Sequence, residues 1–579
     1  MPRKSADPEL IDLRKRIRHS AAHVLAESVL KLFPKAKVTI GPPTDDGFYY
    51  DFDVDRPFTT EDLEKISALM QESIKANHQF HEREVDRDVA LKLVAGNPYK
   101  QEIIEGIPEG EKITFAGHAE FEDLCRGGHV HSTREIRAFK LLSTAGAYWR
   151  GDERNRMLQR VYGTAWESKD GLEKYLHQIE EAEKRDHRKL GSELGLYLFD
   201  PSAPASPFFL PKGAIVYNEL VALLKRLYRK YGYSEVITPQ IFLADLWKRS
   251  GHYDNYKENM YFVEVDDREF GVKPMNCPGH ALLFGASLHS YRDLPVRFAD
   301  FGRLHRYERS GVTHGLTRVR TFVQDDAHIF CAPDQIAAEI NGFIAFLREA
   351  YSVFKFTDIR VALSLRPEKR VGSDEIWDRA EAALGEVLDG SGLEYERMPG
   401  EGAFYGPKID FFVPDAIGRE WQLGTVQLDF SLPQRFDLEY VAEDGSRQRP
   451  VVIHRATLGS LERFIGVLIE HTAGALPLWL SPVQVAVIPI TDRNTAYGHE
   501  VRSRLMHDGL RADLYDSNDR MNAKIRAAQL QKVPYMLVIG DREQAAGQVA
   551  VRKRSGEDLG AMGLNDVAVM LAAEAAERS

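Results

Sequence analysis

FGRLHRYERSGVTHGLTRVRTFVQDDAHIF, residues Phe301–Phe330, is the most informative part of this sequence. Two extended segments, Val296–Tyr307 and Val319–Phe330, are joined by a loop that carries glycine and arginine. Five arginines outweigh Glu308 and Asp325, so the local charge as far as Asp325 is +3. A solvated hairpin would explain these charges. However, glycine lets a ligand approach the backbone and the arginine fork suits phosphate, so we expect an anion-binding hairpin.

The composition around this stretch is that of a globular, multidomain protein. The chain has 579 residues, of which 43% are hydrophobic and 28% charged, and its length favours roughly three to four domains. No apolar run approaches the roughly 18 residues that span a bilayer. Three cysteines are too few for a disulfide framework, and the first residues are unlike a signal peptide. We therefore expect a cytoplasmic protein that does not contact membranes.

The net charge of -11 argues against a protein that is coated in nucleic acid. A global sum can hide a local patch, however. Residues 520–554 contain eight basic and two acidic side chains, a balance of +6. This segment predicts a basic face that suits a nucleic-acid ligand.

Breaks in composition divide the chain into segments. An amphipathic helix is expected over Pro8–Leu32, and a densely charged connecting helix follows Glu167. A proline-rich break lies at Asp200–Gly213, and strands and helices alternate from Val483 onwards. We predict an α+β domain (1–166), a linker helix (167–199), a central domain (200–480) and a small α/β domain (481–579). The last should contain a mixed sheet of about five strands.

Common nucleotide-binding motifs do not explain the sequence. There is no P-loop pattern. GEGAFYG, Gly400–Gly406, nearly matches a dinucleotide fingerprint, but its last glycine is one residue too far along and a strand starting near Lys408 follows it. We therefore exclude a dinucleotide-binding fold.

One group of histidine and cysteine residues comes from the first segment. His19 and His23 in HSAAH are four residues apart on one helix face, and Cys125 and His129 in CRGGH repeat that spacing. This arrangement is known in metal sites and in acid–base catalysis. The glutamate of a zinc-protease motif is missing, and a single buried histidine is often structural, so both interpretations stay open.

A second group is scattered over the central segment. Cys277 lies in MNCPGH, His328 in DDAHIF and His454 in VIHRA. These are ligand types that zinc prefers. Their distance along the chain leaves open whether they meet at all.

Together and in this order, the segments resemble the threonyl-tRNA synthetases, which are class II aminoacyl-tRNA synthetases. YSEVITPQIF with Pro239, the Phe301–Phe330 stretch, and LGSLERFIGVLIEH with Arg463 resemble class II motifs 1, 2 and 3. KPMNCPGH, AFYGPKIDF and WQLGTVQLDF resemble segments of the threonyl enzymes, and HSAAH with CRGGH resembles their editing domain. Two features depart from the family: HSAAH begins at residue 19, which leaves no room for an N-terminal ubiquitin-like domain, and Gly128 replaces a proline.

The resemblance implies a multidomain α+β and α/β protein. Its catalytic core would be the class II antiparallel sheet, between an N-terminal α+β editing domain and a C-terminal α/β anticodon-binding domain. It also implies a homodimer, because class II motif 1 usually forms the dimer interface.

The implied reaction is ATP-dependent attachment of L-threonine to tRNA(Thr) through a threonyl-adenylate. Arg306 would contact the α-phosphate, and Arg318 and Arg463 would bind the ATP tail with Mg²⁺. The implied ATP-binding residues are Arg306, Glu308, Arg318, Phe322 and Arg463, and the implied catalytic residues are Arg306, Arg463, His252 and Lys408.

Cys277, His328 and His454 match the zinc ligands of the family. Zinc that binds both the amino and the hydroxyl group of threonine would reject valine, which an apolar pocket discriminates poorly. The implied threonine-binding residues are Met275, Gln324, Asp326, Tyr405 and Gln422.

Serine keeps the hydroxyl and lacks only a methyl group, so a second, hydrolytic site is needed. The implied editing residues are His19, His23, Lys100, Asp123, Cys125 and His129. Related editing domains of the alanyl enzymes bind zinc with this ligand pattern. Here we expect water-mediated hydrolysis without a metal.

Three other interpretations are weaker. A non-synthetase paralogue of this fold would have broken motifs, whereas the arginines and the cysteine–histidine set are all present. A prolyl or seryl enzyme would not carry both histidine–cysteine groups. A zinc hydrolase built on HSAAH would leave two-thirds of the chain unexplained.

Overall fold

The computed structural model describes residues 8–578 and divides the chain into two compact units, Met1–Glu180 and Glu181–Ser579. None of the helices among the described residues is long and apolar enough to cross a membrane. The boundary between the units falls inside α5 (Lys169–Arg185), a helix without a buried residue. The predicted linker contains a second helix, α6 (His187–Glu193), and the strand β8 (Tyr197–Phe199), so it is not the single helix that the charge pattern suggested.

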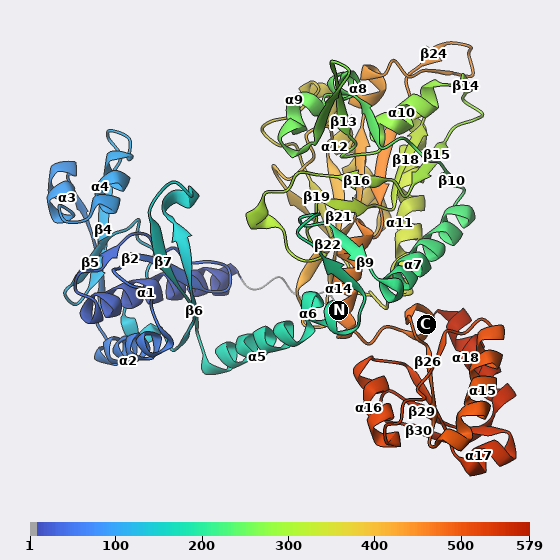
Figure 1. Cartoon of the computed structure of the whole chain (residues 1–579). Coiled ribbons are helices and arrows are strands. Elements are labelled where there is room, and N and C mark those ends of the chain that lie inside the picture. Colours follow the sequence, from blue (N-terminus) through green and yellow to red (C-terminus); the bar gives the residue numbers. More distant parts are fainter. Residues whose placement is uncertain (1–7, 579) are drawn as a thin grey trace. The chain divides into compact units, whose positions relative to one another are not determined.

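The first unit is built from two antiparallel sheets and four helices besides α5 (Figure 1). Helix α1 (Pro8–Leu32) covers the sheet formed by β1 (Lys37–Val38), β2 (Phe48–Asp53), β7 (Met157–Trp166) and β6 (Ala138–Tyr148). The second sheet contains β3 (Phe80–Val85), β4 (Ile113–His118) and β5 (Phe121–Leu124). The other helices are α2 (Thr60–Ala76), α3 (Arg87–Leu93) and α4 (Pro98–Glu105). The apolar side of α1 forms the core with β2 and β7, as expected for an amphipathic helix.

The second unit is organised around an eight-stranded sheet. Its order is β10 (Ser234–Glu235), β15 (Val296–Asp300), β18 (Asp326–Cys331), β25 (Val451–Ala456), β22 (Glu420–Asp429), β21 (Lys408–Pro414), β19 (Arg360–Ser364) and β20 (Tyr395–Met398). All pairs are antiparallel except those at the two edges. The largest core cluster fills one face, under α7 (Pro211–Lys230), α11 (Ile336–Ser352), α12 (Asp374–Ser391) and α14 (Leu461–Thr472). The other face of β18 and β25 carries His328 and His454 and, farther along, Phe330 and Val452 of a smaller apolar cluster.

The extended segments of the opening stretch are shorter than predicted. Each of them is two strands, because β16 (Arg303–His305) and β17 (Thr321–Val323) pair with each other outside the large sheet. One break is at Gly302, where a Cβ would lie 2.3 Å from Asn276 Oδ1. The other is at Asp325, whose carboxylate accepts the backbone N–H groups of Thr457, Leu458 and Gly459. Both breaks depend on residues distant in sequence.

The strand predicted in YSEVITPQIF is also interrupted. β10 joins the large sheet, whereas β11 (Ile241–Leu243) pairs with β13 (Arg268–Val272) in a separate sheet. Pro239 lies between the two, where it cannot donate a ladder hydrogen bond.

The C-terminal part of the second unit is an α/β domain, and its predicted mixed five-stranded sheet is confirmed. The order is β27 (Ala512–Leu514), β26 (Val485–Pro489), β28 (Tyr535–Ile539), β29 (Gln548–Lys553) and β30 (Asp558–Gly563). Alternate residues of β26 face α15 (Thr495–His507) and α18 (Leu564–Glu577) on one side and α16 (Met521–Leu530) on the other. β30 and the short α17 (Asp541–Ala546) were not predicted, because glycines dilute the pattern of β30.

Candidate functional site

A row of polar side chains crosses the three central strands of the large sheet. His328 on β18 is paired with His454 on β25, and His454 is paired with Gln427 on β22. Residues directly opposite each other in a sheet point to the same face. Ile329 and Ile453, one position along, point into the core instead. The alternation of the strands therefore brings together histidines that are 126 positions apart.

Cys277 completes this group from outside the sheet. It is the first residue of α10 (Cys277–Gly285), and it is buried. The ligand atoms of Cys277, His328 and His454 all lie within 4.8 Å of one another, a grouping that could hold a metal ion. His328 Nε2 is 2.9 Å from His454 Nδ1. Burial raises the pKa of the Cys277 thiol well above its usual range and lowers that of His328.

The outward nitrogens of both histidines have buried partners. His454 Nε2 lies 3.0 Å from a carboxylate oxygen of Asp429. His328 Nδ1 lies 2.8 Å from Nδ1 of His280, whose Nε2 faces Asp300 at 3.8 Å. Such contacts fix the ring orientation and leave the opposite nitrogen free to bind a ligand.

A cavity of about 300 Å³ opens beside this group. Among the predicted residues, its lining includes Cys277, His328, His454, Met275, Gln324, Asp326, Tyr405 and Arg306. Asp326 accepts a hydrogen bond from Asn276 at 3.0 Å, and burial raises the pKa of its carboxyl group. The lining also contains residues that the sequence did not predict, namely Tyr256, Phe404, Thr425 and Gln427. The position of Gln427 opposite His454 would have identified it if the register had been known.

Two predicted residues lie outside this lining and meet at Asp410. Lys408 Nζ is 2.8 Å from one oxygen of Asp410, and the Gln422 amide donates to the other at 2.6 Å. Thr425, which lines the cavity, donates to the same oxygen as Gln422. Lys408 and Gln422 therefore reach the cavity wall through a shared carboxylate.

His252 is buried at the start of α9 (His252–Tyr256), next to the cavity. Its Nδ1 is 2.8 Å from Ser250 Oγ, and its Nε2 is 3.2 Å from Met275 Sδ and 3.8 Å from Cys277 Sγ. Burial, together with nearby His454, lowers the pKa of His252 to about 3, so the ring is neutral at physiological pH.

The predicted ATP-binding residues surround the β16–β17 pair. The Arg306 guanidinium lies 5.0 Å from the ring of Phe322 on β17 and donates to the Pro274 carbonyl. Arg318 donates to the Glu308 carboxylate at 3.0 Å. Nε of Arg463 is buried without a partner among the described residues, and burial lowers the pKa of Arg463 with help from the charge of Arg318. A buried guanidinium with an unpaired Nε beside another arginine suits an anionic ligand.

The second predicted group assembles in the first unit, between α1 and the loop after β5. Cys125 Sγ lies 3.4 Å from His19 Nε2 and 3.3 Å from His129 Nε2. With His23, these residues form another grouping whose ligand atoms lie within 4.8 Å. Burial lowers the pKa of His19 and His23 and brings that of His129 to about 3, whereas it raises that of Cys125 to about 11. Without a metal the whole group is uncharged at pH 7.

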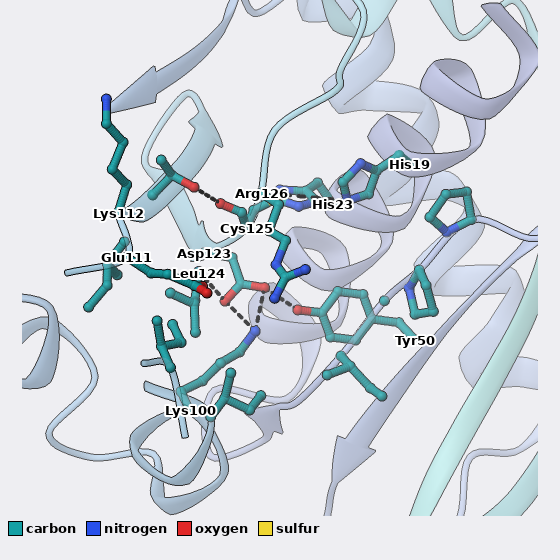
Figure 2. Close-up of a pocket in the computed structure, with 18 residues that line it drawn as sticks. His19, His23, Tyr50, Lys100, Glu111, Lys112, Asp123, Leu124, Cys125 and Arg126 are labelled. Atoms are coloured by element: carbon teal, nitrogen blue, oxygen red, sulfur yellow. Dashed lines mark hydrogen bonds and ion pairs between the residues drawn. The ribbon is translucent and has the colours of Figure 1, made fainter. Parts of the chain in front are cut away.

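Lys100 and Asp123 line a cavity of about 460 Å³ in the first unit, and Cys125 lines the same cavity (Figure 2). Lys100 Nζ on α4 is 2.7 Å from the Asp123 carboxylate on β5, and both are buried. Tyr50 on β2 donates to the same carboxylate and was not predicted. His19 and His23 project towards this cavity from α1. The structure thus brings together the six predicted residues of this unit.

The loop that carries Cys125 and His129 depends on two glycines. Gly127 and Gly128 have φ of +81° and +87°, and the Gly128 N–H donates to Glu82 at 3.1 Å. Proline has neither an N–H group nor access to positive φ. The loop therefore follows a path that a proline at position 128 would exclude.

Only some of the basic side chains in the segment 520–554 form an exposed basic face. Lys524 is buried and donates to the Pro489 carbonyl, and Arg554 donates to the carbonyls of Ala475 and Leu476. Arg552 and Lys553 pair with Asp558 and Glu557. The exposed remainder on and near α16 and α17 is Arg520, Arg526 and Arg542. The predicted +6 balance overestimates the available charge.

Family models match three parts of the chain. They are the tRNA synthetase class II core domain (G, H, P, S and T) at residues 261–472, the anticodon binding domain at 484–574, and the threonyl and alanyl tRNA synthetase second additional domain at 113–162.

Known proteins are similar over nearly the whole chain. A threonine–tRNA ligase of Thiobacillus denitrificans is 52% identical over 576 residues, which are 99% of this chain and 90% of that protein. One from Alkalilimnicola ehrlichii is 52% identical over 98% of this chain and 89% of its own. Among solved structures, the RNA binding domain of threonyl-tRNA synthetase from Cryptosporidium parvum Iowa II has a TM-score of 0.65 at 46% identity, covering 67% of this chain and 98% of that one. A putative threonyl-tRNA synthetase from Aeropyrum pernix has a TM-score of 0.60 at 32% identity, covering 68% and 97%.

The predicted class II core, the additional domain and the anticodon-binding domain are thus confirmed. The chain belongs to the threonine–tRNA ligases, the enzymes that attach threonine to its tRNA.

Proposed function

We propose that the cavity beside Cys277, His328 and His454 is where threonine is activated and transferred. The observation that carries this proposal is the cross-strand row of His328, His454 and Gln427, which stands next to Cys277 and to the acidic Asp326. The carboxylate of Asp326 would accept a hydrogen bond from the amino group of the amino acid, and Gln324 and Tyr405 would orient it. Arg306, in the same lining, would contact the α-phosphate of ATP.

The residues fit a zinc ion. One thiol and two imidazoles are a donor set that zinc prefers, and three protein ligands leave coordination positions open for a substrate. When bound, zinc would supply Lewis-acid coordination to the amino and hydroxyl groups of threonine, and valine lacks the second of these groups. The neutral His252 would accept a hydrogen bond during transfer to the tRNA hydroxyl.

The arginines would supply the electrostatic part of adenylate formation. Charge builds up on phosphate oxygens in this step, and preorganised guanidinium groups stabilise it. Arg463 and Arg318 would bind the ATP tail with Mg²⁺. Phe322 would stack on the adenine ring, and the Glu308 carboxylate would accept a hydrogen bond from the adenine amino group. Lys408 would act through Asp410 and Thr425 at the cavity wall.

The cavity of the first unit would hydrolyse seryl-tRNA. The uncharged histidines can accept hydrogen bonds from an attacking water and orient it, and the Lys100–Asp123 ion pair offers polar groups to the ester. Because burial raises the pKa of Cys125 to about 11, its thiol is not an effective nucleophile at neutral pH. We therefore propose water as the attacking group and no metal in this site.

We also propose that the protein is a homodimer and that it is located in the cytoplasm. Sedimentation equilibrium should give twice the mass of the chain, and a mass equal to that of one chain would contradict the dimer.

The zinc proposal is tested with Cys277→Ser in the full chain. The variant should lose bound zinc, measured by atomic emission, and lose threonine-dependent pyrophosphate exchange. A variant with a full complement of zinc and full activity would contradict the assignment. Cys331→Ser is the matched control, since Cys331 is buried on the opposite face of β18.

The editing proposal is tested with His19→Ala. This variant should aminoacylate normally and accumulate seryl-tRNA. Unchanged hydrolysis of seryl-tRNA would refute the assignment of the site.

A further inference from the structure

His187, the first residue of α6, is a buried connection between three elements of the second unit. Its Nδ1 lies 2.6 Å from Oε1 of Glu470, which is near the end of α14. Its Nε2 accepts the backbone N–H of Leu316 at 2.9 Å. Leu316 lies in the loop between β16 and β17, residues 306–320, which we call the motif 2 loop. The side chain of His187 is fully buried.

These contacts define the tautomer of the ring. An amide N–H always donates, so Nε2 must be the unprotonated nitrogen. Nδ1 therefore carries the proton and donates it to Glu470. The backbone N–H of His187 donates to the same carboxylate oxygen at 3.2 Å, and Arg419 pairs with the other oxygen of Glu470. The imidazole is thus held from one side while it accepts from the loop on the other.

This cluster is not a metal site, although the ligand atoms of Asp186, His187 and Glu470 lie within 4.8 Å of one another. Asp186 caps α6 and pairs with Arg188, and the other two residues are saturated as described. The ring nitrogens of His187 and the carboxylate oxygens of Glu470 and Asp186 thus already have hydrogen-bond or ion-pair partners.

The motif 2 loop is shaped to receive the ring. A Cβ on Gly315, where φ is +47°, would lie 2.2 Å from His187 Nε2. Leu316 is completely buried, and it packs so close to Gly466 on α14 that a Cβ there would lie 3.2 Å from it. Arg318 follows two positions later and is one of the arginines that we assign to the ATP tail.

We propose that His187 is a positioning residue for ATP. By accepting the Leu316 N–H, it fixes the motif 2 loop so that Arg318 and Glu308 are presented to the nucleotide. Helix α6, which directly follows α5 in the chain, thus supports the loop through His187. The inference deepens the proposed function, because it rests on the assignment of Arg318 to ATP binding.

Two substitutions separate the contacts of His187. In His187→Asn, the amide can replace Nδ1 towards Glu470 but cannot reach Leu316. In His187→Gln, the longer side chain can place its oxygen near the Leu316 N–H. We expect His187→Asn to raise the KM for ATP in pyrophosphate exchange by roughly tenfold, because a buried N–H loses its acceptor. His187→Gln should stay closer to the wild type, and the KM for threonine should not change in either variant.

Tyr197→Phe is the matched control for a purely structural effect. The Tyr197 hydroxyl donates to the backbone carbonyl of His187 at 2.7 Å, whereas the imidazole of His187 accepts from the loop. It should lower the melting temperature without changing the KM for ATP. An unchanged KM for ATP in His187→Asn, or equal loss of ATP and threonine binding in all three variants, would overturn the proposal.

Arg318→Ala distinguishes the failure of this inference from that of the proposed function. If Arg318→Ala raises the KM for ATP and His187→Asn does not, only the role of His187 is wrong. If neither variant changes it, the assignment of Arg318 to ATP fails as well.

Discussion

Each ring of the candidate metal group is oriented by a residue that does not face the cavity. His328 is backed by His280, and His454 by Asp429. With Nδ1 of His328 donating to His280, the Nε2 lone pair points to Cys277 and His454. The selectivity of the proposed site for threonine would thus depend on His280 and Asp429, which do not contact the amino acid themselves.

His280→Leu tests this support. The substitution removes the acceptor of His328 and should weaken zinc binding by roughly 10- to 100-fold. Competition with a chromogenic chelator measures the affinity without reference to activity. His280→Gln, which keeps an acceptor, should recover most of it. Wild-type affinity in the leucine variant would show that His280 has no such role.

The ionisation of His129 in the proposed editing site predicts no pH dependence from this ring near neutrality. Burial keeps the pKa of His129 at about 3, so lowering the pH from 8 to 6 does not protonate the ring. The rate constant for seryl-tRNA hydrolysis, measured at saturating enzyme, should therefore not fall through titration of this histidine. A falling limb with an apparent pKa near the usual 6.5 would contradict the burial argument.

At the level of elements, the sharp turn after β15 packs directly against residues of the candidate cavity in the second unit. The chain leaves β15 at Gly302, where only a hydrogen fits next to Asn276 and Lys273. Asn276 precedes Cys277 and donates to Asp326, so the turn, the helix α10 and the proposed amino-acid site share contacts. A change at the turn is therefore transmitted to the cavity.

Gly302→Ala should lower kcat/KM for threonine in pyrophosphate exchange by roughly tenfold, since crowding costs about 1–3 kcal/mol. Gly311→Ala, in the motif 2 loop, is the control, because a Cβ there meets nothing within 4 Å. If the two variants behave alike, the close packing at Gly302 is without functional consequence.

The sequence predicts elements with a strong local pattern and misses those that depend on distant contacts. The Pro8–Leu32 helix and the C-terminal mixed sheet follow from periodicity. The breaks at Gly302 and Asp325 do not, because Asn276 and residues 457–459 create them.

The same limit applies to side chains. Gln427 stood in WQLGTVQLDF beside the predicted Gln422, and only the strand register shows that it faces the cavity. A lone histidine in a charged segment, such as His187, carries no signal in the sequence.

At the scale of the whole molecule, the negative net charge and a tRNA ligand are compatible, because only a local face must be basic. In the anticodon-binding domain, carbonyl contacts hold Lys524 and Arg554 in the fold. The charge available for RNA is thus carried by a few exposed arginines.

Arg526→Glu should lower kcat/KM for tRNA charging and leave pyrophosphate exchange unchanged, because Arg526 is exposed on α16. The defect should shrink at high salt, as for any phosphate contact. Lys553→Glu is the control, since Lys553 is already paired with Glu557. Equal charging by the Arg526 variant and the wild type would remove this arginine from the tRNA-binding face.

The most direct test of the central claim is pyrophosphate exchange measured in parallel with threonine, serine and valine on the full chain. A hydroxyl-selective site predicts rapid exchange with threonine, detectable exchange with serine and essentially none with valine. Exchange with valine at a rate near that with threonine would contradict selection at the Cys277, His328 and His454 group.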